Sequence, residues 1–337
     1  MSEPLREILA HADALFRRGE YGAAIQHFER VIAGSPEAIP SEAALPALSG
    51  LAACWANLGR FNRQAEYAAR LLNRARDAGH HFYIGMAALQ LAYALGMLDP
   101  RNQWPTIRAA LEEGLDAAHT LRDRQLRALQ LIELAKVAVD VKHDPAETDA
   151  WLDEALLSLP LPSEPSNAAI RYRVYRSRAR LCQDRGDPGQ AWEWARAAVM
   201  QAEENGNAHF VQDALVLVAE LDQEQGRPAD ALARAEGSIA EAHTHRWQYT
   251  EHQGQAIRAE ALLDLKRLSD AGAAARAALD LALDLELREK EVVSLLRLGR
   301  VLLALGDPAQ ARPLLKQAHS LSVQRGYPDH AERAAQM

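Results

Sequence analysis

Three arginines and a glutamine recur at helical spacing in one stretch of this chain, and their chemistry suits anion binding. Arg173, Arg176 and Arg180 are three and four residues apart, so one face of a helix carries all three. Gln183 extends that face. Arginine forks bind carboxylates and phosphates through paired hydrogen bonds. In a concave groove, this row would suit an acidic peptide or a chain's C-terminal carboxylate.

Acidic side chains occupy the corresponding positions about 40 residues and about 80 residues further along. They are Asp213, Glu220, Glu224, Glu260 and Asp264. Acids facing arginines across neighbouring helices would form a ladder of ion pairs inside the protein. That ladder, or a plain solvated helix face, is the alternative to ligand recognition, because most exposed charges are simply hydrated.

A second candidate set is apolar and lies earlier in the chain. At the same register stand Met86, Leu89, Tyr93 and Met97, followed by Leu129 and Ile132. Methionine and tyrosine form adaptable apolar binding surfaces, so these residues are candidates for the lining of a groove. The alternative is that this part of the chain packs differently and buries them.

The sequence contains no recognisable catalytic constellation. It has no glycine-rich phosphate loop, no paired-histidine zinc helix, no Cys-x-x-Cys and no Gly-x-Ser-x-Gly. His243, His245 and His252 come nearest to a metal cluster, but no thiol or carboxylate completes a tetrahedral set at ligand spacing. We expect these histidines in a surface loop, and we expect no enzyme activity, cofactor or metal.

Composition favours a helical protein. Of 337 residues, 48% are hydrophobic and only 6% aromatic, with alanine and leucine dominant. The formal net charge of −8 argues against a nucleic-acid or anionic-membrane surface. Cys54 and Cys182 fall in apolar stretches and are expected to be buried free thiols. With no signal peptide or membrane-spanning run evident, we expect a cytoplasmic protein.

A period of about 40 residues positions these side chains. Glycine, a short polar turn and alanine recur at Gly186, Gly226 and Gly306, while Lys266 stands where the missing glycine should be. A small residue suited to close helix packing recurs through the whole chain, at Ala12, Ala52, Ala92, Ala135, Ala179, Ala219, Ala259 and Gly299. A fixed period of this length is typical of a solenoid built from stacked units, here about eight.

The pattern within a unit resembles the tetratricopeptide repeat. In the first unit its residues are Ile8, Ala12, Leu15, Gly19, Tyr21, Ala24, Phe28, Val31 and Pro36. The usual unit is about 34 residues, and the longer variant here is similar to sensor arrays of bacterial transcription activators and peptide-pheromone receptors. The resemblance implies an all-α solenoid of helix-turn-helix repeats, forming a right-handed superhelix whose concave groove binds peptides or protein segments.

The sequence divides into two half-arrays. We expect units one to four in residues 1–159, a proline-rich joint at 160–166, units five to eight in 167–327, and a short capping helix at 328–337. The joint is alternatively a stiff loop inside one continuous solenoid. Asp99-Pro100 replaces the turn glycine of the third unit, and an irregular link is predicted over residues 101–105.

These observations predict a non-enzymatic module that captures a protein or peptide segment in its groove. One alternative is a sensor in which a peptide or small ligand changes the shape of the superhelix to control a partner. Another is a structural scaffold that assembles with copies of itself. Nucleic acid and membranes are not expected partners, and the sequence leaves homo-oligomerisation open.

Overall fold

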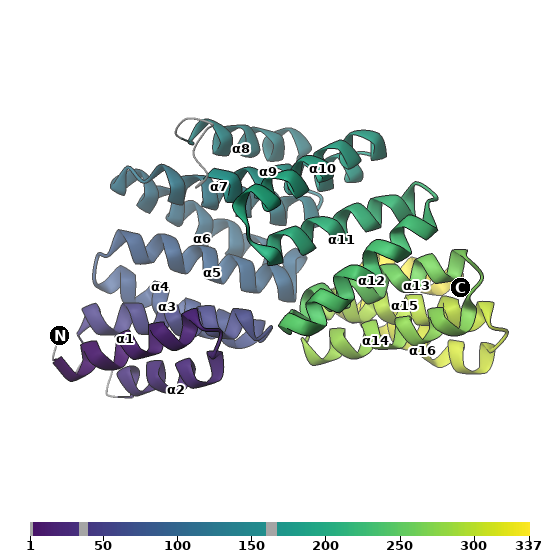
Figure 1. The fold of residues 1–337 in the computed structure, drawn as a ribbon, viewed down its shortest axis with the longest axis horizontal. Coiled ribbons are helices and arrows are strands. Elements are labelled where there is room, and N and C mark those ends of the chain that lie inside the picture. The colour runs from purple at the N-terminus through teal and green to yellow at the C-terminus, as the bar shows by residue number, and fades with distance from the viewer. Residues whose placement is uncertain (1–2, 34–39, 160–166) are drawn as a thin grey trace. The chain divides into compact units, whose positions relative to one another are not determined.

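The computed structural model describes residues 3–33, 40–159 and 167–337, and the regular structure in these ranges is helical throughout. The chain forms two compact units, Met1–Pro162 and Ser163–Met337. Each unit is a stack of helical hairpins (Figure 1). The predicted joint at 160–166 lies outside the described residues.

The N-terminal unit contains four hairpins, in which each helix packs against the next along the chain. Its helices are α1 (Glu3–Arg17), α2 (Tyr21–Ile32), α3 (Ser41–Asn57), α4 (Phe61–Asp77), α5 (His81–Leu98), α6 (Pro100–Leu121), α7 (Arg124–Asp140) and α8 (Pro145–Leu157).

The C-terminal unit contains four more hairpins and a final helix. Its helices are α9 (Ala168–Asp184), α10 (Pro188–Asn205), α11 (Ala208–Glu224), α12 (Pro228–His245), α13 (Gln248–Asp264), α14 (Leu268–Asp284), α15 (Arg288–Ala304), α16 (Pro308–Arg325) and α17 (Pro328–Gln336). The predicted all-α repeat architecture is therefore confirmed.

Small residues allow the two helices of a hairpin to approach closely. The seven periodic alanines, from Ala12 to Ala259, are each 0% exposed. At Gly299 an added Cβ would lie 2.5 Å from the side chain of Leu315, a distance that demands displacement. The period seen in the sequence is thus the spacing of helix-crossing points.

A left-handed residue turns the chain between the helices of most hairpins. Gly59, Gly186 and Gly306 have φ of 68°, 75° and 77°. Where glycine is lost, Lys142 and Lys266 adopt the same conformation, with φ of 54° and 61°. Side chains other than glycine are strained there, so these two lysines show that the tertiary contacts of the hairpin override a local preference.

The irregular link predicted at 101–105 is wrong, because α6 begins at Pro100 and includes those residues. Asp99 forms the entire turn, and its carboxylate accepts hydrogen bonds from the backbone and side-chain amides of Asn102, the latter at 2.9 and 3.1 Å. Proline is also well suited to the first helical position. Capping by Asp99 therefore replaces the longer glycine turn.

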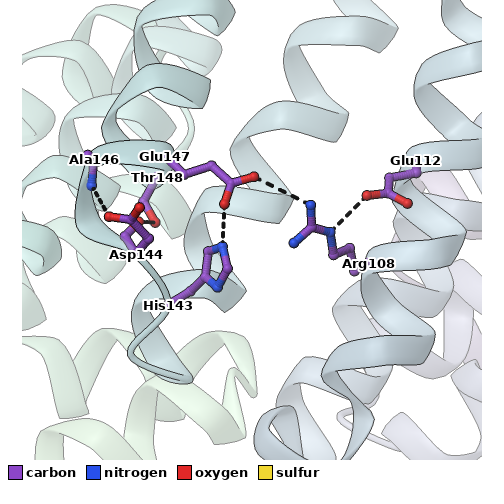
Figure 2. Close-up of polar contacts among 7 residues, drawn as sticks. All are labelled: Arg108, Glu112, His143, Asp144, Ala146, Glu147 and Thr148. Atoms are coloured by element: carbon purple, nitrogen blue, oxygen red, sulfur yellow. Dashed lines mark hydrogen bonds and ion pairs between the residues drawn. The ribbon is translucent and has the colours of Figure 1, made fainter.

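The turn of the fourth hairpin is held by another aspartate cap (Figure 2). Asp144 accepts a hydrogen bond from the backbone amide of Ala146 at 2.9 Å, and the Thr148 hydroxyl donates to the Asp144 carbonyl at 2.9 Å. Two glycine-free turns thus depend on aspartate at the start of the second helix.

Both cysteines are buried and free, as predicted. Burial, reinforced by the charge of Asp13, raises the pKa of Cys54 to about 12, so its thiol stays protonated. Among the described helices, α5 alone is long and apolar enough to cross a membrane, and 44% of it is buried inside the protein. Core helices of globular proteins can have the same length and composition.

Candidate ligand-binding surfaces

The first helices of successive hairpins lie side by side within each unit. In the N-terminal unit α1 contacts α3, α3 contacts α5 and α5 contacts α7, and in the C-terminal unit α9, α11, α13 and α15 form a similar row. Among the described residues, second helices do not contact one another to a comparable extent. Each unit therefore curves toward its first helices. We call the α9–α15 side the C-terminal inner face and the α5–α7 side the N-terminal inner face.

Two of the three predicted arginines of α9, Arg176 and Arg180, meet acids of α11 on the C-terminal inner face. Arg176 pairs with Asp213 at 2.6 Å from Nε to Oδ2, and the Tyr172 hydroxyl donates to the same carboxylate. Burial alone would raise the pKa of Asp213, but the charge of Arg176 and the bond from Tyr172 lower it. Arg173 lies differently, with its guanidinium 5.2 Å from the Phe210 ring centroid.

A second rung joins the same two helices. Arg180 pairs with Glu220 at 2.7 Å, and the Gln183 amide donates to Glu220 at 3.3 Å and to Glu224 at 2.6 Å. Burial alone would raise the pKa of Glu220, but Arg180 and these hydrogen bonds lower it to about 2. Six of the predicted residues thus pair with one another between α9 and α11.

The ladder continues through α13 to α15. The Gln223 amide donates to Asp264, and Glu260 pairs with Arg297 at 2.9 Å and also with Arg300. Sequence reasoning missed both of these arginines. Arg300 directly follows the periodic small residue, as do Arg180, Glu220 and Glu260. The repeat register could therefore have predicted that Arg300 lies on the same face.

The loop expected for the three histidines is wrong. His243 and His245 lie in the last turn of α12, and His252 lies within α13, where it is 3% exposed. Burial, together with the charges of Lys290 and Arg297, lowers the pKa of His252 to about 3. No group of three metal-ligating side chains occurs among the described residues.

The N-terminal inner face is largely apolar. Met86, Leu89, Tyr93, Met97 and Leu129 are each partly buried. Ile132 is only 3% exposed, so that predicted lining residue packs in the interior instead.

Lys136 places a cation on this apolar surface. The Lys136 ammonium is 4.3 Å from the Tyr93 ring centroid and 2.8 Å from the Glu133 carboxylate. Burial alone would lower the pKa of Lys136, but these neighbours raise it. Lys136 is therefore charged and already has an aromatic and an acidic partner.

A separate polar cluster joins α6 to α8 in the N-terminal unit (Figure 2). The His143 ring lies 5.4 Å from the Trp104 ring and is stacked at 5.8 Å on Trp151. Its Nε2 is 2.6 Å from Glu147, which also pairs with Arg108 at 3.4 Å. These contacts join the fourth hairpin to the third.

Comparison with solved structures identifies the fold. No protein-family model matches the chain, and no curated protein does. The quorum sensor NprR in complex with its cognate peptide NprX has a TM-score of 0.66 at 14% identity, over 93% of this chain and 86% of that one. The apo form of NprR from B. thuringiensis has a TM-score of 0.62 at 12% identity, over 94% and 87%.

A Rap protein complexed with Competence and Sporulation Factor is also similar. Its TM-score is 0.59 at 15% identity, over 99% of this chain and 95% of that one. At such identities the likeness shows the fold alone. The chain therefore has the tetratricopeptide-like helical repeat fold that its sequence predicts.

Proposed function

We propose that this chain is a non-catalytic binding module that captures a peptide or an extended protein segment on its C-terminal inner face. One observation carries the proposal: four successive first helices gather buried and half-buried charges of both signs on one surface. Such a surface can match the backbone and side-chain charges of an extended segment. Two solved structures of the same fold are NprR in complex with its cognate peptide NprX and a Rap protein complexed with Competence and Sporulation Factor, which supports the choice of ligand class.

Within this face, Arg173 is the predicted residue best placed to meet a ligand. Its guanidinium lies over an aromatic ring, whereas Arg176 and Arg180 are paired with Asp213 and Glu220. A cation over an aromatic face keeps its hydrogen-bond donors available to a second partner.

The test is equilibrium dialysis of the protein against a random hexapeptide library, with retained peptides identified by mass spectrometry. Arg173→Glu should lower the affinity for the retained peptides at least about tenfold, because one charge-assisted hydrogen bond is lost. Arg196→Glu is the matched control, because Arg196 lies on the second helix α10 with its guanidinium 4.8 Å from the Trp192 ring. Absence of any enriched peptide, or equal losses in both variants, would contradict the proposal.

The ladder also favours a sensing role. Its ion pairs connect successive repeats, so a ligand that takes one partner of a pair would alter the spacing between hairpins. We expect small-angle scattering of the protein saturated with a retained peptide to show a change in maximum dimension. If the maximum dimension of the protein is unchanged at saturation, the sensing role is rejected and simple capture of the peptide remains.

A further inference from the structure

The first hairpin of the N-terminal unit, formed by α1 and α2 (Figure 1), brings two histidines together. Gly19 turns the chain between these helices with a φ of 77°. His11 comes eight residues before this glycine and His27 comes eight residues after it, so the antiparallel hairpin places them opposite each other. The two ring centroids are 4.6 Å apart, with an angle of 74° between the ring planes.

The two rings have each other as neighbours but no polar partner. His11 is exposed and His27 is half-buried. In the part of the chain that the structure describes, neither imidazole forms a hydrogen bond or an ion pair. By contrast, His143 and His330 have glutamate partners at 2.6 and 3.2 Å. The nitrogen atoms of His11 and His27 therefore remain available to a ligand from outside the chain.

The surroundings of His27 favour its neutral form. Burial, together with the charges of His11 and Arg30, lowers the pKa of His27. Two protonated imidazoles this close would also repel each other. A neutral imidazole has one unprotonated nitrogen, which is the form of histidine that binds a metal ion.

The separation of the rings fits two imidazoles bound to one metal ion. A zinc ion lies about 2.0–2.1 Å from each histidine nitrogen, so two rings bound at about 90–110° to each other have centroids about 4.5–5.2 Å apart. The distance of 4.6 Å between His11 and His27 lies in this range. Imidazole suits zinc, copper and nickel, whereas magnesium and calcium prefer oxygen ligands.

We propose that His11 and His27 together bind one divalent transition-metal ion of the zinc, copper and nickel class and so join α1 to α2. Water molecules complete the coordination, because the pair supplies two ligands. The first hairpin of a repeat array packs against a neighbouring hairpin on one side only, so it gains less from contacts between repeats than an internal hairpin does. A metal ion held by both of its helices would stabilise this end of the array. The site belongs to the N-terminal unit and does not depend on peptide capture.

Isothermal titration calorimetry of the full chain with nickel chloride or zinc chloride at pH 7.5 tests the site. We expect saturable binding of one equivalent of either ion and no binding of magnesium chloride. Absence of saturable nickel and zinc binding, or equal binding of magnesium, would overturn the proposal.

Variants identify the two ligands. His11→Phe keeps a ring at an exposed position and removes its nitrogens, and His27→Gln removes the second imidazole. Each should lower the affinity for nickel at least about tenfold, since loss of even an outer-shell partner of a metal site costs about 10–100-fold. His243→Ala/His245→Ala, which removes two exposed histidines of α12, is the matched control and should bind nickel as tightly as the unmodified chain. Unchanged affinity in His11→Phe, or an equal loss in the control, would place the ion elsewhere.

Hydrogen–deuterium exchange followed by mass spectrometry gives a second readout that does not depend on affinity. Saturating nickel should slow amide exchange in residues 3–33 and leave residues 167–337 unchanged, because the ion joins α1 to α2 alone. The slowing should be absent in His11→Phe, with circular dichroism confirming that this variant is folded. Slowing that is confined to other helices, or that persists in His11→Phe, would contradict the proposed site.

Discussion

The two inner faces present different chemistry from the same positions of the repeat. The residues that follow the periodic small residue are Asp13, Ala53, Tyr93 and Lys136 in the N-terminal unit, but Arg180, Glu220, Glu260 and Arg300 in the C-terminal unit. In the N-terminal unit, the Tyr93 ring lies beside the Phe61 ring and the Lys136 ammonium. In the C-terminal unit, guanidinium groups on α9 and α15 flank carboxylates on α11 and α13.

The difference shows which positions the fold constrains. The small residue itself must be small because two helices cross there, as at Ala92 and Ala179. The next residue points along the inner face and is free to take any chemistry. The repeat therefore determines where a binding residue stands and leaves its type open.

The largest expected loss of stability comes from removing one partner of an ion pair between two first helices. Asp213→Ala leaves Arg176 and Tyr172 without their shared acceptor, and we expect a loss of about 3 kcal/mol in the free energy of unfolding. Urea titration followed by circular dichroism measures this loss. The double variant Arg176→Met/Asp213→Leu should recover most of it, since neither charge is then left unpaired. A double variant as unstable as the single one would show that packing, not charge pairing, dominates.

A smaller effect depends on pH and on His252. The ordinary pKa of histidine is 6.5 and that of folded His252 is about 3, so between these values the unfolded chain binds a proton that the folded chain does not. Stability from this group is complete above pH 6.5 and falls with decreasing pH, by about 1.4 kcal/mol at pH 5.5. His252→Phe should remove this component of the pH dependence. The test compares urea midpoints of both proteins at pH 7.5 and 5.5, and parallel changes would contradict it.

Turn substitutions should act alike in both units, because the hairpin backbone is shared. Lys266→Gly should raise the free energy of unfolding by about 1 kcal/mol by relieving a left-handed lysine. In the N-terminal unit the reverse change, Gly59→Lys, should lower it by a similar amount. Thermal melts provide the measurement. Opposite responses would mean that the two turns differ in more than sequence.

The smallest effect is expected on the N-terminal inner face. Met86 and Met97 are only partly buried, so serine at either position should cost less than about 1 kcal/mol. The same variants should lower the binding of an apolar fluorescent dye, whereas Arg173→Glu on the other unit should not. Dye binding that is unchanged in Met86→Ser/Met97→Ser would show that this face does not present an apolar surface.

Much of the fold could be predicted from the sequence because helix-crossing points demand small residues at a constant spacing. The error at residues 101–105 arose because a lost glycine suggested an irregular link, whereas Asp99 and Pro100 together start a helix directly. The repeat register also predicted that one surface carries Arg176, Arg180, Asp213 and Glu220. The register does not tell whether these charges pair with each other or remain available to a ligand, because that depends on side-chain positions.

Other parts of the candidate site could not be found this way. His252 is adjacent in sequence to exposed histidines and an aromatic pair, and nothing in that pattern reveals that it is buried.

The rungs between successive first helices have a mechanical consequence. A stack of hairpins can extend elastically when its ends are pulled apart. On the inner face of the C-terminal unit, ion pairs connect neighbouring first helices and resist that extension; they are Arg176–Asp213, Arg180–Glu220 and Glu260–Arg297. Salt weakens attraction between charges within reach of solvent, with a screening length of about 10 Å at 0.1 M. The force needed to extend the C-terminal unit should therefore fall as ionic strength rises.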